Sequence, residues 1–246
     1  MIDIENLVVR RGEGYVLRDV TAHVPEGTAV RVTGPNGSGK TTLLHVIAGL
    51  AAPDAGRVTV AGHAPADPVV RTLRGFVQEP PPLYEHLTAD EQLGLVAGVW
   101  GLRARDLRER AGDLGLGDRF DVLVGDLSLG QRKKLGYLCA TAHEPRLLLL
   151  DEPFNGLDAA AEQAVREDLA RWRAEGRTLV VVSHSDSSVA DLVDVTLTLE
   201  TAASGRTGTD KTRTDGTRTN ETRTGETTTA ETRTAETGTA GTEAGA

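Results

Sequence analysis

Apolar residues stand among polar residues throughout the first 33 positions of the chain, in the way that is typical of β-strands. They are Ile2, Ile4, Leu7 and Val9, and then Val16, Leu17, Val20 and Val24. Turn-forming residues such as Gly12 and Gly27 bound these groups, so we expect one strand before Gly12 and another after it. A short apolar strand over residues 28–33 then leads directly into a glycine-rich loop.

The spacing of apolar residues changes between about residues 88 and 116, where they recur at the period of a helix. This segment predicts a mostly helical insertion between two parts rich in strands. Strands that alternate with helices indicate a largely parallel α/β sheet. The other predicted elements are short strands at 57–60 and 75–77, helices at 40–50, 129–143 and 159–175, and strands at 147–150, 178–183 and 193–199.

Residues 201–246 differ from the rest, with 17 Thr and 7 Ala and no aliphatic, aromatic or sulfur-containing residue larger than Ala. From Thr207 they form five-residue units, a period that matches neither a helix nor a strand. Such a segment buries too little apolar surface to offset the entropy of ordering it. We expect a folded domain over residues 1–200 and a disordered tail over 201–246, with a binding or phosphorylated tail as the alternative.

The chain carries a net charge of −9, of which the tail contributes −1. An acidic body argues against a nucleic-acid partner, because phosphate contacts favour a basic face. Cys139 is the single cysteine, which excludes a disulfide framework and a cysteine zinc site. We expect it to be a small buried residue of a helix. The longest uncharged stretch, residues 41–53, is shorter than the roughly 20 residues of a spanning helix, so we expect a cytoplasmic chain.

A glycine-rich loop, Gly34-Pro-Asn-Gly-Ser-Gly-Lys-Thr41, lies between the apolar strand and the first predicted helix. Glycines let the backbone N–H groups point inward around a diphosphate, and the helix adds its positive end. Lys40 is placed to reach the β- and γ-phosphates, and the Thr41 hydroxyl to bind Mg²⁺. The alternative is a simple glycine turn.

Four leucines, residues 147–150, precede Asp151 and Glu152. A carboxylate at the end of a buried strand suits Mg²⁺, and the next carboxylate is placed to polarise an attacking water. Together with the glycine-rich loop, this pair predicts hydrolysis of a nucleoside triphosphate.

The segments between these motifs resemble those of the ABC-type ATPases. Leu127-Ser-Leu-Gly-Gln131 resembles the family's signature sequence, and residues 155–158 its D-loop. Gln78 stands where the family has its Q-loop glutamine. His184 matches the switch histidine, although it is also consistent with an ordinary surface histidine. Tyr15 matches the aromatic residue under adenine, although a packing role on a strand is the alternative. The resemblance covers residues 1–200.

The resemblance implies a P-loop NTPase (RecA-like) core with an antiparallel β subdomain and a helical subdomain inserted over residues 84–128. Such domains pair head to tail around two ATP molecules, each held by the phosphate loop of one domain and the signature of the other. The implied partners are a second ATPase domain, identical or a paralogue, and a separate transmembrane permease, which the family docks on the helical insertion and residues 79–87. The chain would then lie on the inner face of the cell membrane.

The resemblance also assigns a role to each site residue. Glu152 would be the general base and His184 the γ-phosphate sensor, and Asp158 would belong to the D-loop. The residues expected to bind ATP are Tyr15, Gly34, Pro35, Asn36, Gly37, Ser38, Gly39, Lys40, Thr41, Thr42 and Gln78; those expected to bind Mg²⁺ are Thr41, Gln78 and Asp151; those expected to act on the partner's ATP are Ser128, Leu129, Gly130 and Gln131.

The chain departs from the common family pattern at two positions, with Leu129 in place of Gly in the signature and Asn155 in place of Ser in the D-loop. Leu129 is expected to allow activity with a looser contact to the γ-phosphate. The basic run Arg132-Lys133-Lys134 is expected to be a solvated helix face.

These features predict the ATPase subunit of a membrane transporter, most similar to bacterial export ATPases of the drug type. A soluble ABC ATPase of translation or DNA repair is the alternative. Those relatives carry two ATPase domains or a long coiled-coil insertion, whereas this chain has one domain and only residues 84–126 between Leu83 and the signature. A weakly active regulatory subunit is a third reading, which Glu152 argues against.

Overall fold

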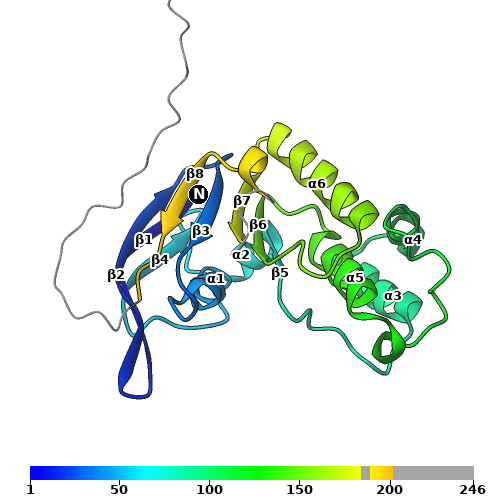
Figure 1. Cartoon of the computed structure of the whole chain (residues 1–246), viewed down its shortest axis with the longest axis horizontal. Helices are drawn as coiled ribbons and strands as arrows, with labels where there is room; N and C mark the ends of the chain where they lie inside the picture. The colour runs from blue at the N-terminus through cyan, green and yellow to red at the C-terminus, as the bar shows by residue number, and fades with distance from the viewer. Residues whose placement is uncertain (184–188, 202–246) are drawn as a thin grey trace, which may run out of the picture. The chain divides into compact units, whose positions relative to one another are not determined.

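The computed structural model of the 246-residue chain describes residues 1–183 and 189–201. The predictions made for His184 and for the tail beyond residue 201 therefore fall outside the described residues. The described elements form two sheets and a set of helices (Figure 1), and no described helix is long and apolar enough to cross a membrane.

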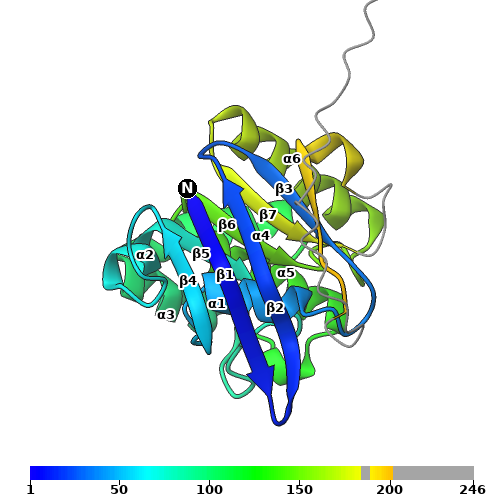
Figure 2. The same ribbon diagram turned by 90° about the vertical axis from the view of Figure 1, so that its left-hand side faces the viewer.

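The antiparallel sheet contains β1 (Ile2–Arg11), β2 (Gly14–Val24) and β4 (Ala55–Val60), in the order β2-β1-β4. Figure 2 shows the three strands side by side. Ile2 and Ile4, and then Leu7 and Val9, point from β1 into the core, because residues two apart on a strand face the same side of the sheet. A register shift between Ile4 and Leu7 separates the two pairs. The pattern of apolar residues in the sequence correctly predicted β1 and β2.

The second sheet is parallel and contains β5 (Arg74–Val77), β6 (Leu147–Asp151), β7 (Thr178–Val182), β3 (Ala29–Thr33) and β8 (Val195–Thr198), in that order. Every residue of β6 and β7 is buried, since both faces of the sheet are covered. On β6, Leu147 and Leu149 face α1 (Lys40–Ile47) and the antiparallel sheet, whereas Leu148 and Leu150 face the remaining large helices.

Those helices are α3 (Ala89–Trp100), α4 (Ala104–Asp113), α5 (Leu129–Thr141) and α6 (Ala159–Ala174). Figure 1 shows them on the side of the parallel sheet away from the antiparallel sheet. The chain enters and leaves the helical insertion at adjacent points, because Thr88 pairs with Leu123 and Ala89 N donates to Val122 O at 3.0 Å. The predicted helical insertion is therefore a distinct part of the fold.

Short helices complete the described fold, namely α2 (Pro68–Leu73) and the 3-10 helices Val124–Asp126 and Ala190–Leu192. The pattern of apolar residues did not predict α2. Its start is encoded locally, since Asp67 accepts a hydrogen bond from Val69 N and Pro68 occupies the first turn.

The ring of Trp100 at the end of α3 stacks on the ring of His143, with centroids 3.8 Å apart and planes 7° from parallel. His143 Nε2 also forms a hydrogen bond of 3.0 Å with Arg74 O. Burial lowers the pKa of His143, so the imidazole is neutral at pH 7. This stack and hydrogen bond link the helical insertion to β5.

Candidate active site

The strands of the parallel sheet direct their carboxyl ends to one edge, and the segments at the ends of three of them carry predicted site residues. The glycine-rich loop follows β3, Gln78 follows β5, and Asp151 with Glu152 ends β6. Ligands of open α/β sheets bind at this edge. The parallel topology therefore gathers residues that are far apart in the sequence.

The glycines of the loop are required by its backbone and its neighbours. Gly34, Gly37 and Gly39 have φ angles of 150°, 80° and 92°. A Cβ on Gly34 would lie 2.4 Å from Leu199 O, and one on Gly39 would lie 2.6 Å from Leu17 Cδ2. Because a Cβ atom does not approach other atoms so closely, Gly34 and Gly39 accept no larger residue without a shift of their neighbours, whereas Gly37 is favoured by its φ angle alone.

The loop leads directly into the N-terminus of α1, which begins at Lys40. No described side chain caps the helix at Gly39, and its first turn contains no acidic residue. Because the first N–H groups of a helix have no partner within the helix, they and the helix dipole favour an anion. Ser38 is fully buried beneath the loop, whereas Pro35, Asn36 and Gly37 are exposed and Thr42 is partly buried.

Lys40 lies over the same loop. Its Nζ donates hydrogen bonds to Gly34 O at 2.8 Å and to Pro35 O at 3.1 Å, and the residue is 8% exposed. The ammonium group is thus held at the mouth of the loop, where it adds a full positive charge to the partial charges of the helix N-terminus.

Thr41 and Asp151 meet across the site. Thr41 Oγ1 donates a hydrogen bond of 2.8 Å to Asp151 Oδ2. Burial raises the pKa of Asp151, and the hydrogen bond from Thr41 opposes this rise. Gln78 lies beside them, because the last residue of β5, Val77, pairs with Leu150 of β6. The amide, the hydroxyl and the carboxylate predicted to bind Mg²⁺ therefore come from three neighbouring elements.

Glu152 follows Asp151 in the left-handed backbone region, with a φ of 47°. Its backbone N donates to Val182 O at 3.0 Å, which ties the residue to the end of β7. A residue other than glycine is uncommon in this conformation. The hydrogen bond fixes the direction in which the second carboxylate leaves the strand.

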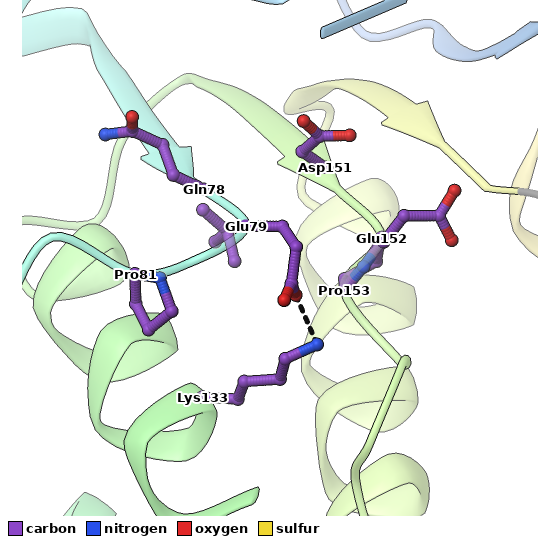
Figure 3. A pocket seen from close by; sticks show the side chains of 8 residues that line it. Gln78, Glu79, Pro81, Lys133, Asp151, Glu152 and Pro153 are labelled. Atoms are coloured by element: carbon purple, nitrogen blue, oxygen red, sulfur yellow. Dashed lines mark ion pairs between the residues drawn. The ribbon is translucent and has the colours of Figure 1, made fainter. Parts of the chain in front are cut away.

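A small pocket lies beside these carboxylates, and Figure 3 shows its lining. Glu79 and Lys133 point toward each other there and form an ion pair. The pocket is lined by Val77, Gln78, Glu79, Pro81, Lys133, Asp151, Glu152 and Pro153.

The prediction that Arg132-Lys133-Lys134 forms a solvated face is wrong for the two lysines. Lys133 is 7% exposed and Lys134 is 8% exposed. Lys133 pairs with Glu79 and donates to Asn155 O at 2.6 Å, and Lys134 pairs with Asp158 at 2.7 Å. These partners lie 22 or more positions away in the sequence, so no local pattern identifies them.

The signature residues open α5, outside the pocket. Ser128 caps the helix by accepting a hydrogen bond from Gln131 N at 3.2 Å, and Gln131 Oε1 accepts one from Ser128 N at 3.0 Å. Leu129 is 57% exposed. A Cβ on Gly130 would lie 2.9 Å from Gly156 O, so the signature turn lies directly against residues 155–158.

Tyr15 and Asp158 occupy the margins of the site. Tyr15 is a half-exposed residue of β2, and the guanidinium groups of Arg10 and Arg18 lie 4.9 and 5.2 Å from its ring centre. Asp158 caps α6 by accepting a hydrogen bond of 2.9 Å from Ala161 N. His184, predicted to follow β7, lies outside the described residues.

Comparisons with known proteins agree with this architecture. The family model described as ABC transporter matches residues 17–155. The lantibiotic transport ATP-binding protein SrtF of Streptococcus pyogenes is 32% identical over 79% of this chain and 84% of its own length. The bacitracin transport ATP-binding protein BcrA of Enterococcus faecalis is 34% identical over 79% of this chain and 65% of its own length.

An import protein is similar to a comparable degree. The aliphatic sulfonates import ATP-binding protein SsuB 2 of Pseudomonas fluorescens is 35% identical over 81% of this chain and 72% of its own length. A solved dimeric ATP-binding cassette in a post-hydrolysis state, bound to ADP and Pi, matches with a TM-score of 0.71 and 26% identity over 82% of this chain and 96% of the other. This chain therefore belongs to the ABC transporter family, as an ATP-binding subunit that hydrolyses ATP.

Proposed function

We propose that the chain works as one of a pair of ATPase domains that hydrolyse ATP with Mg²⁺ and drive export through a separate membrane permease. The observation that carries the proposal is the 2.8 Å contact between Thr41 and Asp151, beside the loop that holds Lys40. It places a hydroxyl and a carboxylate next to a cradle of backbone N–H groups.

In this proposal the glycine-rich loop binds the phosphates of ATP. The loop fits such a group, because its glycines leave space that a Cβ would fill and because Gly34 O and Pro35 O hold the Lys40 ammonium against it. Tyr15 provides an exposed ring for the adenine base. Residues 34–42 and Gln78 complete the proposed nucleotide contacts.

The donor set of Thr41, Gln78 and Asp151 suits Mg²⁺, which prefers hard oxygen ligands and usually binds protein oxygens and phosphate oxygens together. Within the described residues no cluster of three or more His, Cys, Asp or Glu side chains forms a softer metal site. Mg²⁺ would neutralise charge on the phosphates when bound. Thr41 and Asp151 would hold it in place through groups that already face each other.

Glu152 is proposed as the general base that accepts a proton from the attacking water. Its backbone hydrogen bond to Val182 fixes where its side chain leaves β6, next to Asp151. His184 keeps its proposed role as a sensor of the γ-phosphate. The two carboxylates then have different roles: Asp151 binds the metal, and Glu152 accepts the proton of the attacking water.

The exposed signature turn, Ser128 to Gln131, is proposed to complete the site of a second ATPase domain. Ser128 and Gly130 open α5, so a hydroxyl, backbone N–H groups and the helix dipole can face a γ-phosphate of the partner. We propose no nucleic-acid partner, in keeping with the acidic charge of the chain.

The permease is proposed to dock on the helical insertion and residues 79–87. Tyr84, Leu95 and Val99 are exposed there by 53%, 44% and 70%. This places the chain at the cytoplasmic face of the membrane, bound through the permease. Residues 1–200 are proposed to form the ATPase domain, and the threonine-rich repeat segment beyond residue 201 lies outside the described residues.

Export is proposed over import because the segments Leu83–Leu93 and Leu127–Leu135 resemble those of drug exporters and because SrtF and BcrA act in lantibiotic and bacitracin transport. A peptide antibiotic is therefore the cargo class to test. The experiment purifies the chain from membranes and identifies what co-purifies, then compares the sensitivity of cells with and without Glu152→Gln to such peptides. Co-purification with ribosomes, or unchanged sensitivity alongside defective solute uptake, contradicts the proposal.

A further inference from the structure

Two consecutive lysines of α5 hold the segment 155–158 at both of its ends. Lys133 donates to Asn155 O at 2.6 Å, and Lys134 pairs with Asp158 at 2.7 Å. Between these two anchors, Gly156 lies against Gly130 of the signature turn. The signature helix and the segment 155–158 therefore form one connected unit.

Lys133 has a second partner in a third element. It forms an ion pair with Glu79, which follows Gln78 in the segment after β5, and both side chains line the pocket beside Asp151 and Glu152 (Figure 3). One ammonium group thus joins three segments that the sequence places far apart, namely residues 78–79, α5 and residues 155–158.

Stability alone is a poor explanation for these buried charges. The side chain of Lys133 is 6% exposed and that of Glu79 is 31% exposed. Removing an ammonium group from water is costly, and apolar residues of similar size are often as stabilising at such positions. What an apolar side chain cannot reproduce is the fixed geometry among three polar groups.

We propose that Lys133 is a positioning residue for ATP hydrolysis, which makes the signature turn and the segment 155–158 follow the movement of residues 78–79. The inference rests on the proposed function, because it assumes that Gln78 contacts the nucleotide site and that the signature turn faces a partner. A change at Gln78 moves Glu79, and the ion pair transmits that movement to α5.

The test uses the full chain with four single variants and the double variant that combines Glu79→Gln with Lys133→Met. Lys133→Met removes the charge and keeps much of the length, whereas Lys133→Arg keeps a cation that can reach both partners. Glu79→Gln removes the opposite charge at a more exposed position and leaves Lys133 bonded to Asn155. Arg105→Met is the matched control, because Arg105 is an exposed residue of α4 whose recorded ion partner is Glu109 of the same helix.

We expect Lys133→Met to lower kcat about tenfold while KM for ATP changes less than about threefold, which is the pattern for a group that acts after binding. Glu79→Gln should lower kcat in the same direction, and its effect should add little to that of Lys133→Met, because both break one linkage. Lys133→Arg and Arg105→Met should keep kcat within about twofold of the wild type.

A second measurement distinguishes a loss of the folded state from a loss of the positioning role of Lys133. ATP-induced dimerisation is compared by size-exclusion chromatography in a Glu152→Gln background, at a temperature well below the melting point of each variant. Lys133→Met should form a smaller fraction of dimer at saturating ATP. If Lys133→Met folds and has the kcat and dimerisation of the wild type, the inference is overturned. If Lys133→Met does not fold, a wild-type kcat in Glu79→Gln overturns the inference instead. Failure of the wild type itself to dimerise with ATP counts against the proposed function instead.

Discussion

The hydroxyl of Thr41 lies 2.8 Å from a carboxylate oxygen of Asp151 and joins two residues that are 110 positions apart in the sequence. The contact connects the first turn of α1 to the last residue of β6. Two proposed metal ligands are therefore adjacent without any rearrangement of the backbone.

Asp151→Asn should lower the kcat of Mg²⁺-dependent ATP hydrolysis about a hundredfold or more. Asparagine can still accept the hydrogen bond from Thr41, but it carries no charge for the metal. The measurement is ATPase activity and nucleotide affinity over a range of Mg²⁺ concentrations, with EDTA as the metal-free reference. A variant with the same Mg²⁺ dependence as the wild type would remove Asp151 from the proposed metal site.

Lys40→Ala should abolish tight ATP binding, because the loop loses its ammonium group near the phosphates. The side chain also bridges Gly34 O and Pro35 O, so the loop should become less ordered. Equilibrium binding of a fluorescent ATP analogue measures the loss, and circular dichroism checks that the fold persists. Unchanged affinity in a folded variant would show that the phosphates bind elsewhere.

Glu152→Gln should keep ATP binding and trap a dimer. Glutamine keeps the size of the side chain but cannot accept the proton of the attacking water. Size-exclusion chromatography with ATP and Mg²⁺ should show an accumulated dimer for the variant and a monomer for the wild type after hydrolysis. Full hydrolysis by the variant would eliminate the catalytic role. The permease raises the local concentration of the two domains, so weak dimerisation in isolation weighs less than retained hydrolysis.

Gly39→Ala should cost more stability than Gly12→Ala, although both glycines have positive φ angles. A Cβ at Gly39 would meet Leu17 Cδ2 at 2.6 Å and Val16 O at 2.9 Å, whereas one at Gly12 would meet no described atom within 4 Å. We expect about 1 kcal/mol for the backbone strain at Gly12 and more than about 2 kcal/mol at Gly39. Urea denaturation measures both, and equal losses would mean that the loop yields to the added methyl group.

The Cys139 thiol should react slowly with thiol reagents at pH 8 in the folded protein. Burial raises its pKa to about 12, so the reactive thiolate is scarce at that pH. In the unfolded chain its pKa returns to roughly 8.5. The folded state then binds more protons between these values, so Cys139 contributes to a fall in stability as the pH rises above 8.5. The rate of thiol labelling with and without denaturant checks the slow reaction of Cys139 in the folded protein. Fast labelling of the native protein would contradict the prediction.

Local patterns predicted most of the elements. The alternation at Ile2 and Ile4 and the leucine run of β6 each depend on neighbours within a few residues, so the sequence alone indicated them. The order of the parallel strands was not predicted, because it depends on which distant segments pair. The helix α2 was also missed, since six residues are too few to establish a helical period.

The candidate site could be proposed from the sequence for the same reason, where it rests on contiguous motifs. The glycine-rich loop and the pair Asp151-Glu152 are each continuous in the sequence. The burial of Lys133 and Lys134 was not predictable, because Glu79, Asn155 and Asp158 come from other segments. A charged run on a helix indicates a solvated face unless the partners that neutralise it are known.

The stacked pair of Trp100 and His143 also makes the helical insertion visible to spectroscopy. The chain has two tryptophans, and Trp172 is buried in α6 with the Arg177 guanidinium 4.9 Å from its ring centre. The emission of Trp100 depends on a ring contact between α3 and the segment after α5, whereas that of Trp172 depends on the packing of α6. In a Trp172→Phe protein, the remaining tryptophan fluorescence would therefore report displacements of α3 directly, as an intrinsic probe that needs no added dye.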